Sequence, residues 1–220
     1  MNIRKINYNG RIYEFESYQD RDKLDREWIK RKTFYEYKLL DTVKKMNLTG
    51  VYIDLGSNVG NHSIFFATQC KATKVICVDA SSELCEVLKK NWDRNVKNEV
   101  ALEIYNNAIT NSSGLVTMTP LHETTCEINK KGSGNVYAKT IDELFGDLRG
   151  VVLLKMDIEG YEIEAIRGAK NFIENNYPVI VAELLDATYF RWFKKEVSKF
   201  GYVTNGKNYA STPTYFWIKR

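Results

Sequence analysis

The segment from Val51 to Gly60, Val-Tyr-Ile-Asp-Leu-Gly-Ser-Asn-Val-Gly, constrains the fold more than any other part of the chain. It begins with a short, mostly apolar run, which is typical of a buried strand. Gly56 and Gly60 then allow a tight turn and a close approach of the main chain to a ligand. A helix is predicted directly after them, from Asn61 to Cys70. A strand, a glycine turn and a helix in this order predict an α/β protein that binds a ligand where the strand ends.

Short apolar runs alternate with amphipathic stretches from this segment to the end of the chain. Strands are predicted at Val51–Leu55, Lys74–Val78, Ala101–Ile109, Leu115–Met118, Val151–Met156, Val179–Leu184 and Thr214–Lys219. Helices are predicted at Asn61–Cys70, Ser82–Asn91, Glu162–Asn175 and Ala187–Phe200. Because apolar strands separated by helices imply a sheet covered on both faces, we expect an α/β sandwich with a mostly parallel sheet.

The residues before Val51 have a different pattern. Residues 1–16 alternate apolar and polar side chains, which predicts a small hairpin or an extended arm, and residues 20–46 have helical periodicity. A chain of 220 residues fits one domain of ordinary size. We therefore expect residues 1–48 to form an N-terminal arm and helix within the same domain as the ligand-binding part, residues 49–220.

Charge and composition give no indication of a nucleic-acid or membrane partner. The net charge is only +4, and basic residues alternate with acids, as in Arg21–Glu27, so no nucleic-acid partner is expected. No apolar stretch is long enough to cross a bilayer, and the N-terminus lacks the apolar region of a secretory signal. The four cysteines form no C-x-x-C motif and are typical of a reducing compartment. We expect a cytoplasmic protein without a membrane segment.

The glycine turn differs from a dinucleotide-binding turn in two ways. Asn58 replaces the middle glycine of the G-x-G-x-x-G fingerprint, and Asp54 stands two residues before Gly56. A carboxylate is unfavourable beside a pyrophosphate but suits a cationic ligand. S-adenosylmethionine carries a sulfonium and an ammonium and no phosphate. The turn therefore favours S-adenosylmethionine as cofactor, with an ordinary strand-turn-helix connection as the alternative.

The next two strands end in residues that suit an adenosyl group. Asp79 comes about twenty residues after the turn, where a carboxylate can take both ribose hydroxyls. Ala80 follows it directly. After the third strand, the side chain of Asn107 and the amide of Ala108 could bind an adenine edge, although a turn-forming asparagine explains that position equally well.

The most unusual segment is Lys155–Glu162, Lys-Met-Asp-Ile-Glu-Gly-Tyr-Glu. Glu159 and Glu162 could be ordinary first-turn helix residues, which the helix dipole favours. Asp157 is different because it closes a strand predicted beside the strand of the glycine turn, and Glu183 closes the strand after it. We expect these carboxylates to neutralise a sulfonium, to orient an acceptor hydroxyl or to hold a divalent metal.

Each of the two histidines has two interpretations. His62 lies in the first turn after the glycine segment and is either structural or close to the cofactor. His122 lies in the polar loop Pro120–Gly134, where it is either the general base or a solvated loop residue.

Taken together, an ordered set of segments resembles the FkbM-type methyltransferases. The matching segments are Tyr52–Ser63, Lys139–Leu144, Leu154–Glu162, Ile166–Ala169 and Pro178–Glu183. They follow the family's order between about residues 50 and 184, and Lys155–Glu162 followed by Arg167-Gly-Ala is the most specific of them.

The resemblance implies a class I methyltransferase (Rossmann-like) sandwich with a seven-stranded sheet. It also implies that the protein methylates a hydroxyl of a sugar, glycan or natural product. It implies S-adenosylmethionine as cofactor. The family usually has glutamate where this chain has Asp79, and Glu36 loosely matches an acid of some members. The predicted cofactor-binding residues are Glu36, Asp54, Gly56, Asn58, Gly60, Asn61, Ser63, Asp79, Ala80, Asn107, Ala108 and Asp157. The predicted catalytic residues are Asp157, Glu159 and His122.

Other interpretations stay open. A Mg²⁺ ion held by Asp157 and Glu183 is an alternative means of activating the acceptor. A nucleotide-dependent oxidoreductase or epimerase and a non-catalytic S-adenosylmethionine-binding partner subunit are alternative functions. A nucleic-acid methyltransferase is disfavoured because the chain has no Asn/Asp-Pro-Pro-Tyr motif. The oligomeric state, including a homodimer, is not determined by the sequence.

Overall fold

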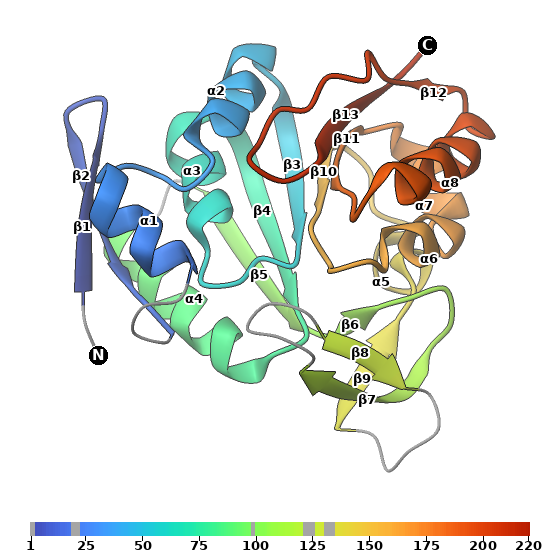
Figure 1. Cartoon of the computed structure of the whole chain (residues 1–220), viewed down its shortest axis with the longest axis horizontal. Helices are drawn as coiled ribbons and strands as arrows, with labels where there is room; N and C mark the ends of the chain where they lie inside the picture. The colour runs from blue at the N-terminus through green and yellow to red at the C-terminus, as the bar shows by residue number, and fades with distance from the viewer. Residues whose placement is uncertain (1–2, 19–22, 98–99, 121–125, 130–134) are drawn as a thin grey trace. The chain divides into compact units, whose positions relative to one another are not determined.

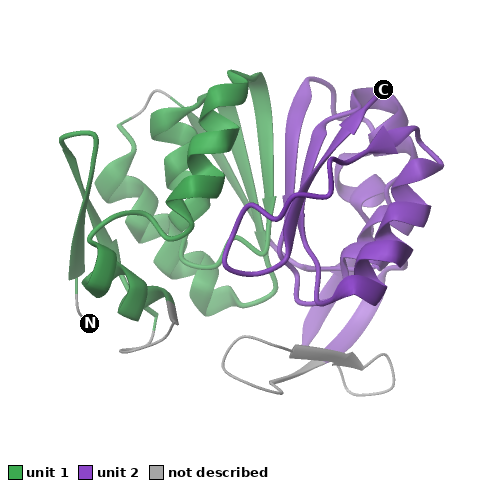
Figure 2. Ribbon diagram, turned by 45° about the horizontal axis from the view of Figure 1, so that its top comes forward, with its two compact units in different colours: residues 1–105 green, residues 106–220 purple. Residues whose placement is uncertain are grey.

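The computed structural model describes residues 3–18, 23–97, 100–120, 126–129 and 135–220 (Figure 1). The chain divides into two compact units, residues 1–105 and residues 106–220 (Figure 2).

The first unit opens with an antiparallel hairpin and continues with helices and strands in alternation. Its elements are β1 (Ile3–Tyr8), β2 (Arg11–Glu16), α1 (Lys23–Arg31), α2 (Tyr37–Met46), β3 (Thr49–Leu55), α3 (Asn61–Gln69), β4 (Lys71–Asp79), α4 (Ser82–Asn95) and β5 (Ala101–Asn106). The predicted N-terminal hairpin is confirmed. The prediction of one helix over residues 20–46 is wrong, because left-handed backbone conformations at Lys32 (φ 51°) and Glu36 (φ 55°) separate α1 from α2.

The sheet of the first unit has the order β3-β4-β5. β3 and β4 run parallel, with Asp54 opposite Cys77 and Leu55 opposite Val78, and α3 and α4 both pack on β4. The hairpin belongs to the same core, because the buried ring of Phe34 makes edge-on contacts with Tyr8, at a centroid distance of 5.8 Å, and with Phe65, at 5.1 Å.

The second unit has two sheets. Its elements are β6 (Ala108–Ile109), β7 (Gly114–Pro120), β8 (Cys126–Asn129), β9 (Val136–Lys139), α5 (Ile141–Phe145), β10 (Val151–Met156), α6 (Glu162–Arg167), α7 (Lys170–Asn176), β11 (Val179–Glu183), α8 (Ala187–Ser198), β12 (Tyr202–Val203) and β13 (Thr214–Lys219). β10 and β11 run parallel, and β13 runs antiparallel to both β11 and β12. The smaller sheet has the order β6-β9-β7-β8.

Two predicted elements are divided in the structure. The strand predicted over Ala101–Ile109 is β5 followed by the separate β6, which pairs with β9 instead. The helix predicted over Glu162–Asn175 is interrupted at Gly168, whose amide donates to the carbonyl of Glu164. A Cβ at Gly168 would lie 2.9 Å from the carbonyl oxygen of Thr110, so glycine permits a close approach of two chain segments here.

The expected architecture is confirmed. Among the described residues the larger sheet has the expected number of seven strands, and helices alternate with the parallel strands. In the part of the chain that the structure describes, no helix is both long and apolar enough to cross a membrane.

Candidate functional site

The glycine turn between β3 and α3 is built from residues with left-handed backbone conformations. Gly56 (φ 71°), Asn58 (φ 49°) and Gly60 (φ 89°) all have positive φ. The amides of Gly56 and Ser57 donate to the carbonyl of Val78, at 2.9 Å and 3.2 Å. These bonds fix the first half of the turn to the end of β4, so the turn and the end of the second strand form one structure.

Asp79 connects the end of β4 to the same turn. Its Oδ2 accepts a hydrogen bond from the amide of Asn58 at 2.8 Å, and its Oδ1 accepts one from the amide of Ser81 at 3.0 Å. Asp79 is half-buried and Asn58 is exposed, so the carboxylate lies at an accessible place beside the turn. The structure thus brings together the two sequence features that predicted an adenosyl group.

Asp54 and Ser63 form a buried pair under the turn. The hydroxyl of Ser63 donates to Asp54 Oδ2 at 2.5 Å, and both residues are fully buried. A carboxylate away from water requires such hydrogen bonds to offset its lost hydration. This bond joins the end of β3 to the first turn of α3, the two elements that the glycine turn connects.

Asn61 uses its side chain to hold the N-terminal segment. Its Oδ1 accepts hydrogen bonds from Trp28 Nε1 at 3.0 Å and from the amide of Tyr35 at 3.2 Å, and its Nδ2 donates to the carbonyl of Tyr35 at 3.2 Å. The side chain of Asn61 is therefore engaged within the protein, so a contact of this residue with a cofactor would involve its main chain.

Glu36 lies beside the first turn of α3. Its Oε2 is 3.6 Å from His62 Nε2, and the two side chains are 4% and 7% exposed. The ring of Tyr35 lies parallel to that of His62, with centroids 6.4 Å apart. The loose match of Glu36 to the family thus falls close to the glycine turn, although its role in cofactor binding stays a prediction.

In the second unit, Asp157 follows the end of β10 and is paired with a lysine. Lys155 Nζ lies 3.5 Å from Asp157 Oδ2, and the lysine side chain is only 7% exposed while that of the aspartate is 30% exposed. A carboxylate at this distance favours the charged form of a buried ammonium group. Lys155 therefore holds Asp157 at the end of the strand, with part of the carboxylate accessible.

The loop after Asp157 has an unusual backbone. Glu159 (φ 53°) and Gly160 (φ 96°) are both left-handed. Glu162 Oε1 accepts hydrogen bonds from the amides of Ile158, at 2.9 Å, and Gly160, at 3.4 Å. Burial raises the pKa of Glu162 to about 7, the charge of Asp157 adds to this rise, and the amide bonds oppose it. Glu162 is thus an internal support of this loop and not a solvent-facing residue of the first helical turn.

The remaining predicted residues have these positions. Ala80 is half-buried before α4, and Ala108 is buried in β6. Asn107 Nδ2 donates to the carbonyl of Tyr137 at 2.9 Å. Glu159 and Glu183 are half-buried. His122 lies outside the described residues.

No metal is assigned to Asp157 and Glu183. Among the residues that the structure describes, no group of three or more His, Cys, Asp and Glu side chains is placed so that it could hold a metal ion.

Two supporting residues were missed by the sequence analysis. The sequence pattern indicates only a helix-dipole role for Glu162, although its position after a buried strand and a glycine is a sign of a constrained loop. The pattern also predicts that the helix ends at Asn91, but α4 continues for another turn and the side chain of Asn91 reaches the carbonyl of Val59 in the glycine turn, at 3.0 Å.

Comparisons with known proteins point to one family. A family model described as the methyltransferase FkbM domain matches residues 54–206. The hexuronic acid methyltransferase AglP of Haloferax volcanii is 26% identical over 133 residues, which cover 58% of this chain and 53% of that protein. The chain thus spans about half the length of this curated relative.

Solved structures show the same fold. Methyltransferase FkbM from Methylobacillus flagellatus is 14% identical with a TM-score of 0.55, over 77% of this chain and 43% of that one. The structure of TYW2 from M. jannaschii in complex with AdoMet is 12% identical with a TM-score of 0.51, over 98% and 83% of the two chains. The fold is that of class I methyltransferases.

Proposed function

This chain belongs to the FkbM methyltransferase family, and we propose that it transfers a methyl group from S-adenosylmethionine to a hydroxyl of a sugar, in a glycan or a natural product. The observation that carries the proposal is the hydrogen bond from the amide of Asn58 to Asp79, which joins the glycine turn to the carboxylate expected at the ribose.

The residues of the first unit fit this cofactor chemically. Asp79 has two carboxylate oxygens at the turn, and these can accept hydrogen bonds from the two hydroxyls of a ribose. Asp54 and Glu36 add negative charge, which favours a cationic group and disfavours a pyrophosphate. The positive φ angles of Gly56 and Gly60 allow the main chain to approach a ligand closely.

In the second unit, we propose that Asp157 binds the acceptor hydroxyl. S-adenosylmethionine supplies an already activated methyl group when it is bound, so the chain's task is alignment and exclusion of water. The partly accessible carboxylate of Asp157 would accept a hydrogen bond from the acceptor hydroxyl and take its proton. Lys155 and the loop held by Glu162 keep this carboxylate in place. Glu159, on the same loop, and His122 are further candidates for contact with the acceptor.

We propose a sugar as the acceptor because AglP of Haloferax volcanii is a hexuronic acid methyltransferase. Since the chain spans about half of that protein, its acceptor is best sought among several sugars and not in hexuronic acids alone. We also propose a cytoplasmic location, which the cysteine pattern of a reducing compartment supports.

The experiment is an assay of methyl transfer. The purified protein is incubated with methyl-labelled S-adenosylmethionine and a panel of oligosaccharides, nucleotide sugars and sugar-containing natural products, with and without hexuronic acid. We expect label in at least one sugar acceptor, and we expect the Asp157→Asn variant to lose it. Binding of the cofactor without transfer to any member of the panel would favour a non-catalytic binding subunit instead.

A further inference from the structure

Helix α4 holds the N-terminal hairpin through two asparagines one turn apart. Asn91 Oδ1 accepts a hydrogen bond from the amide of Glu16 at 2.7 Å, and its Nδ2 donates to the carbonyl of the same residue at 3.0 Å. Asn95 repeats the pattern on Glu14, accepting at 2.9 Å and donating at 2.7 Å. The two side chains thus pair with the edge of β2 as a neighbouring strand would.

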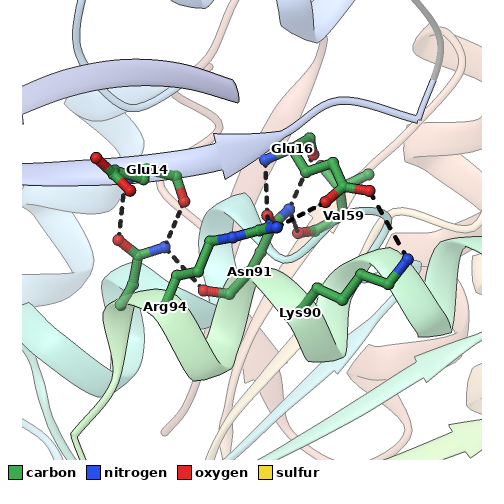
Figure 3. A network of polar contacts seen from close by, with 7 residues as sticks. Glu14, Glu16, Val59, Lys90, Asn91 and Arg94 are labelled. Carbon is green, nitrogen blue, oxygen red and sulfur yellow. Dashed lines mark hydrogen bonds and ion pairs between the residues drawn. The ribbon is translucent and has the colours of Figure 1, made fainter. Parts of the chain in front are cut away.

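The two asparagines differ in their second donor hydrogen. Asn95 Nδ2 also donates to the carbonyl of Asn91, within its own helix, at 2.8 Å. Asn91 Nδ2 instead donates to the carbonyl of Val59 at 3.0 Å, and Val59 is the fourth residue of the glycine turn (Figure 3). Asn91 is fully buried, and Arg94 Nη1 donates to its Oδ1 at 3.3 Å. The amide of Asn91 therefore uses both donors and both lone pairs.

Helix α4 also packs against the glycine turn at Gly60, the residue after Val59. A Cβ at Gly60 would lie 3.1 Å from Leu88 Cγ, one turn of α4 before Asn91. The second half of the turn, Val59 and Gly60, thus rests on α4, while its first half is bonded to Val78 at the end of β4. Asn58, whose amide donates to Asp79, lies between these two supports.

Charges strengthen the attachment of the hairpin at the same place. Arg94 Nη2 lies 2.8 Å from Glu16 Oε2, and Lys90 Nζ lies 3.8 Å from Glu16 Oε1. The Glu16 side chain is 5% exposed, while the side chains of Arg94 and Lys90 are 30% and 49% exposed, so a buried carboxylate is paired with cations that reach the solvent. Figure 3 shows Glu16 beside Lys90, Asn91 and Arg94 of α4.

We propose that Asn91 is a positioning residue of the cofactor site, which couples the docking of hairpin β1–β2 to the conformation of the glycine turn. Its side chain bonds to both structures at once, so each structure stabilises the geometry that the other needs. Cofactor binding then tightens the hairpin, and release of the hairpin weakens cofactor binding. This inference rests on the proposed cofactor site in the first unit.

The test compares Asn91→Asp with the matched variant Asn95→Asp. Both substitutions keep the acceptor for β2 and remove the donors, but only the first removes the bond to the glycine turn. In titrations with S-adenosylhomocysteine, we expect Asn91→Asp to bind about tenfold more weakly than the wild type, as the loss of a buried hydrogen bond implies. The affinity of Asn95→Asp for S-adenosylhomocysteine should stay within about twofold of the wild type. The melting temperatures of the two variants should be similar.

A second measurement tests whether ligand binding at the glycine turn stabilises the hairpin. Hydrogen exchange of the amides of Glu14 and Glu16 should slow in the wild type when S-adenosylhomocysteine binds. In Asn91→Asp this protection should be lost, while Asn95→Asp should keep it at Glu16. The Asn91→Ala and Asn95→Ala pair serves the same comparison if an aspartate variant does not fold.

Two results would overturn the coupling. Equal loss of affinity in the Asn91 and Asn95 variants would mean that Asn91 acts only on stability, and unchanged exchange at Glu16 in the liganded wild type would mean that the hairpin is not coupled. Both results assume a wild type that binds S-adenosylhomocysteine, so they are distinct from a failure of the proposed function. A wild type that does not bind it would overturn both proposals.

Discussion

The carboxylate of Asp79 accepts a hydrogen bond from the main-chain amide of Asn58 at 2.8 Å. Asp79 ends one strand of the first unit, and Asn58 is the middle residue of the turn after the neighbouring strand. The short side chain of Asp79 thus reaches the main chain of the glycine turn.

Replacement of Asp79 should affect cofactor binding first. Asp79→Ala removes both carboxylate oxygens, so S-adenosylhomocysteine should bind about 10- to 100-fold more weakly, as expected for hydrogen bonds to a charged group. Asp79→Glu restores the family's residue and should bind within about threefold of the wild type. Calorimetric titration measures both variants. Equal affinity of Asp79→Ala and the wild type would remove Asp79 from the site.

Asp157→Asn should separate transfer from binding. The amide cannot take a proton from the acceptor, so kcat for methyl transfer should fall about 100-fold while S-adenosylhomocysteine affinity changes little. Asp186→Asn is the control, because Asp186 caps α8 by accepting hydrogen bonds from the amides of Thr188 and Tyr189. Asparagine is an equally good N-cap and keeps the accepting oxygen, so that variant should stay within about 0.5 kcal/mol of the wild type in stability and keep its kcat. A full kcat in Asp157→Asn would exclude this residue as the base.

Glu162 should make stability depend on pH near neutrality. Its pKa is raised from 4.5 to about 7, mainly by burial, so the folded state holds the proton more tightly than the unfolded chain. The stabilisation is complete below about pH 4.5 and is lost as the pH rises through 7. Between pH 5 and 8 the wild type should lose roughly 1–3 kcal/mol of unfolding free energy relative to Glu162→Gln, which stays neutral. Melting curves of the two proteins give this difference, and parallel pH profiles would contradict it.

Gly60→Ala should disturb both stability and binding. At φ 89° an alanine is strained, and its Cβ would also lie 3.1 Å from Leu88 Cγ. Gly10→Ala is the matched control, because Gly10 has φ 79° in the hairpin turn and a Cβ there would meet nothing within 4 Å. Denaturant unfolding should show Gly60→Ala to be about 1–2 kcal/mol less stable than the control, with weaker S-adenosylhomocysteine binding. Equal costs at the two positions would show that Leu88 yields without penalty.

Much of the fold could be predicted because its main strands are apolar and end in distinctive residues. β10 (Val151–Met156) has the predicted bounds, and β3 and β11 differ from theirs by one or two residues. The break between α1 and α2 could not be predicted, because Lys32 and Glu36 adopt positive φ although neither is a glycine or an asparagine. The contacts at these positions join segments that are distant in sequence: the carbonyl of Lys32 accepts from the amide of Asn7, and Glu36 lies 3.6 Å from His62 of α3.

The parts of the candidate site whose chemistry depends on one residue could be predicted from the sequence. The side chains that support another segment of the chain could not. The turn and Asp79 follow from local sequence, and the structure places them together. The support from Asn91 could not be inferred, because it depends on the packing of α4 between the hairpin and the turn, which are 75 and 32 residues away in sequence. The burial of Glu162 likewise depends on the loop before it and not on its helix.

The central claim is that the glycine turn and Asp79 bind an adenosyl cofactor that carries a positive charge and no phosphate. Isothermal titration of the purified chain with S-adenosylmethionine and S-adenosylhomocysteine, with NAD as comparison, tests it most directly. We expect dissociation constants of about 1–100 μM for the first two ligands and no heat of binding with NAD. Binding of NAD, or no binding of either adenosyl ligand at about 1 mM, would contradict it.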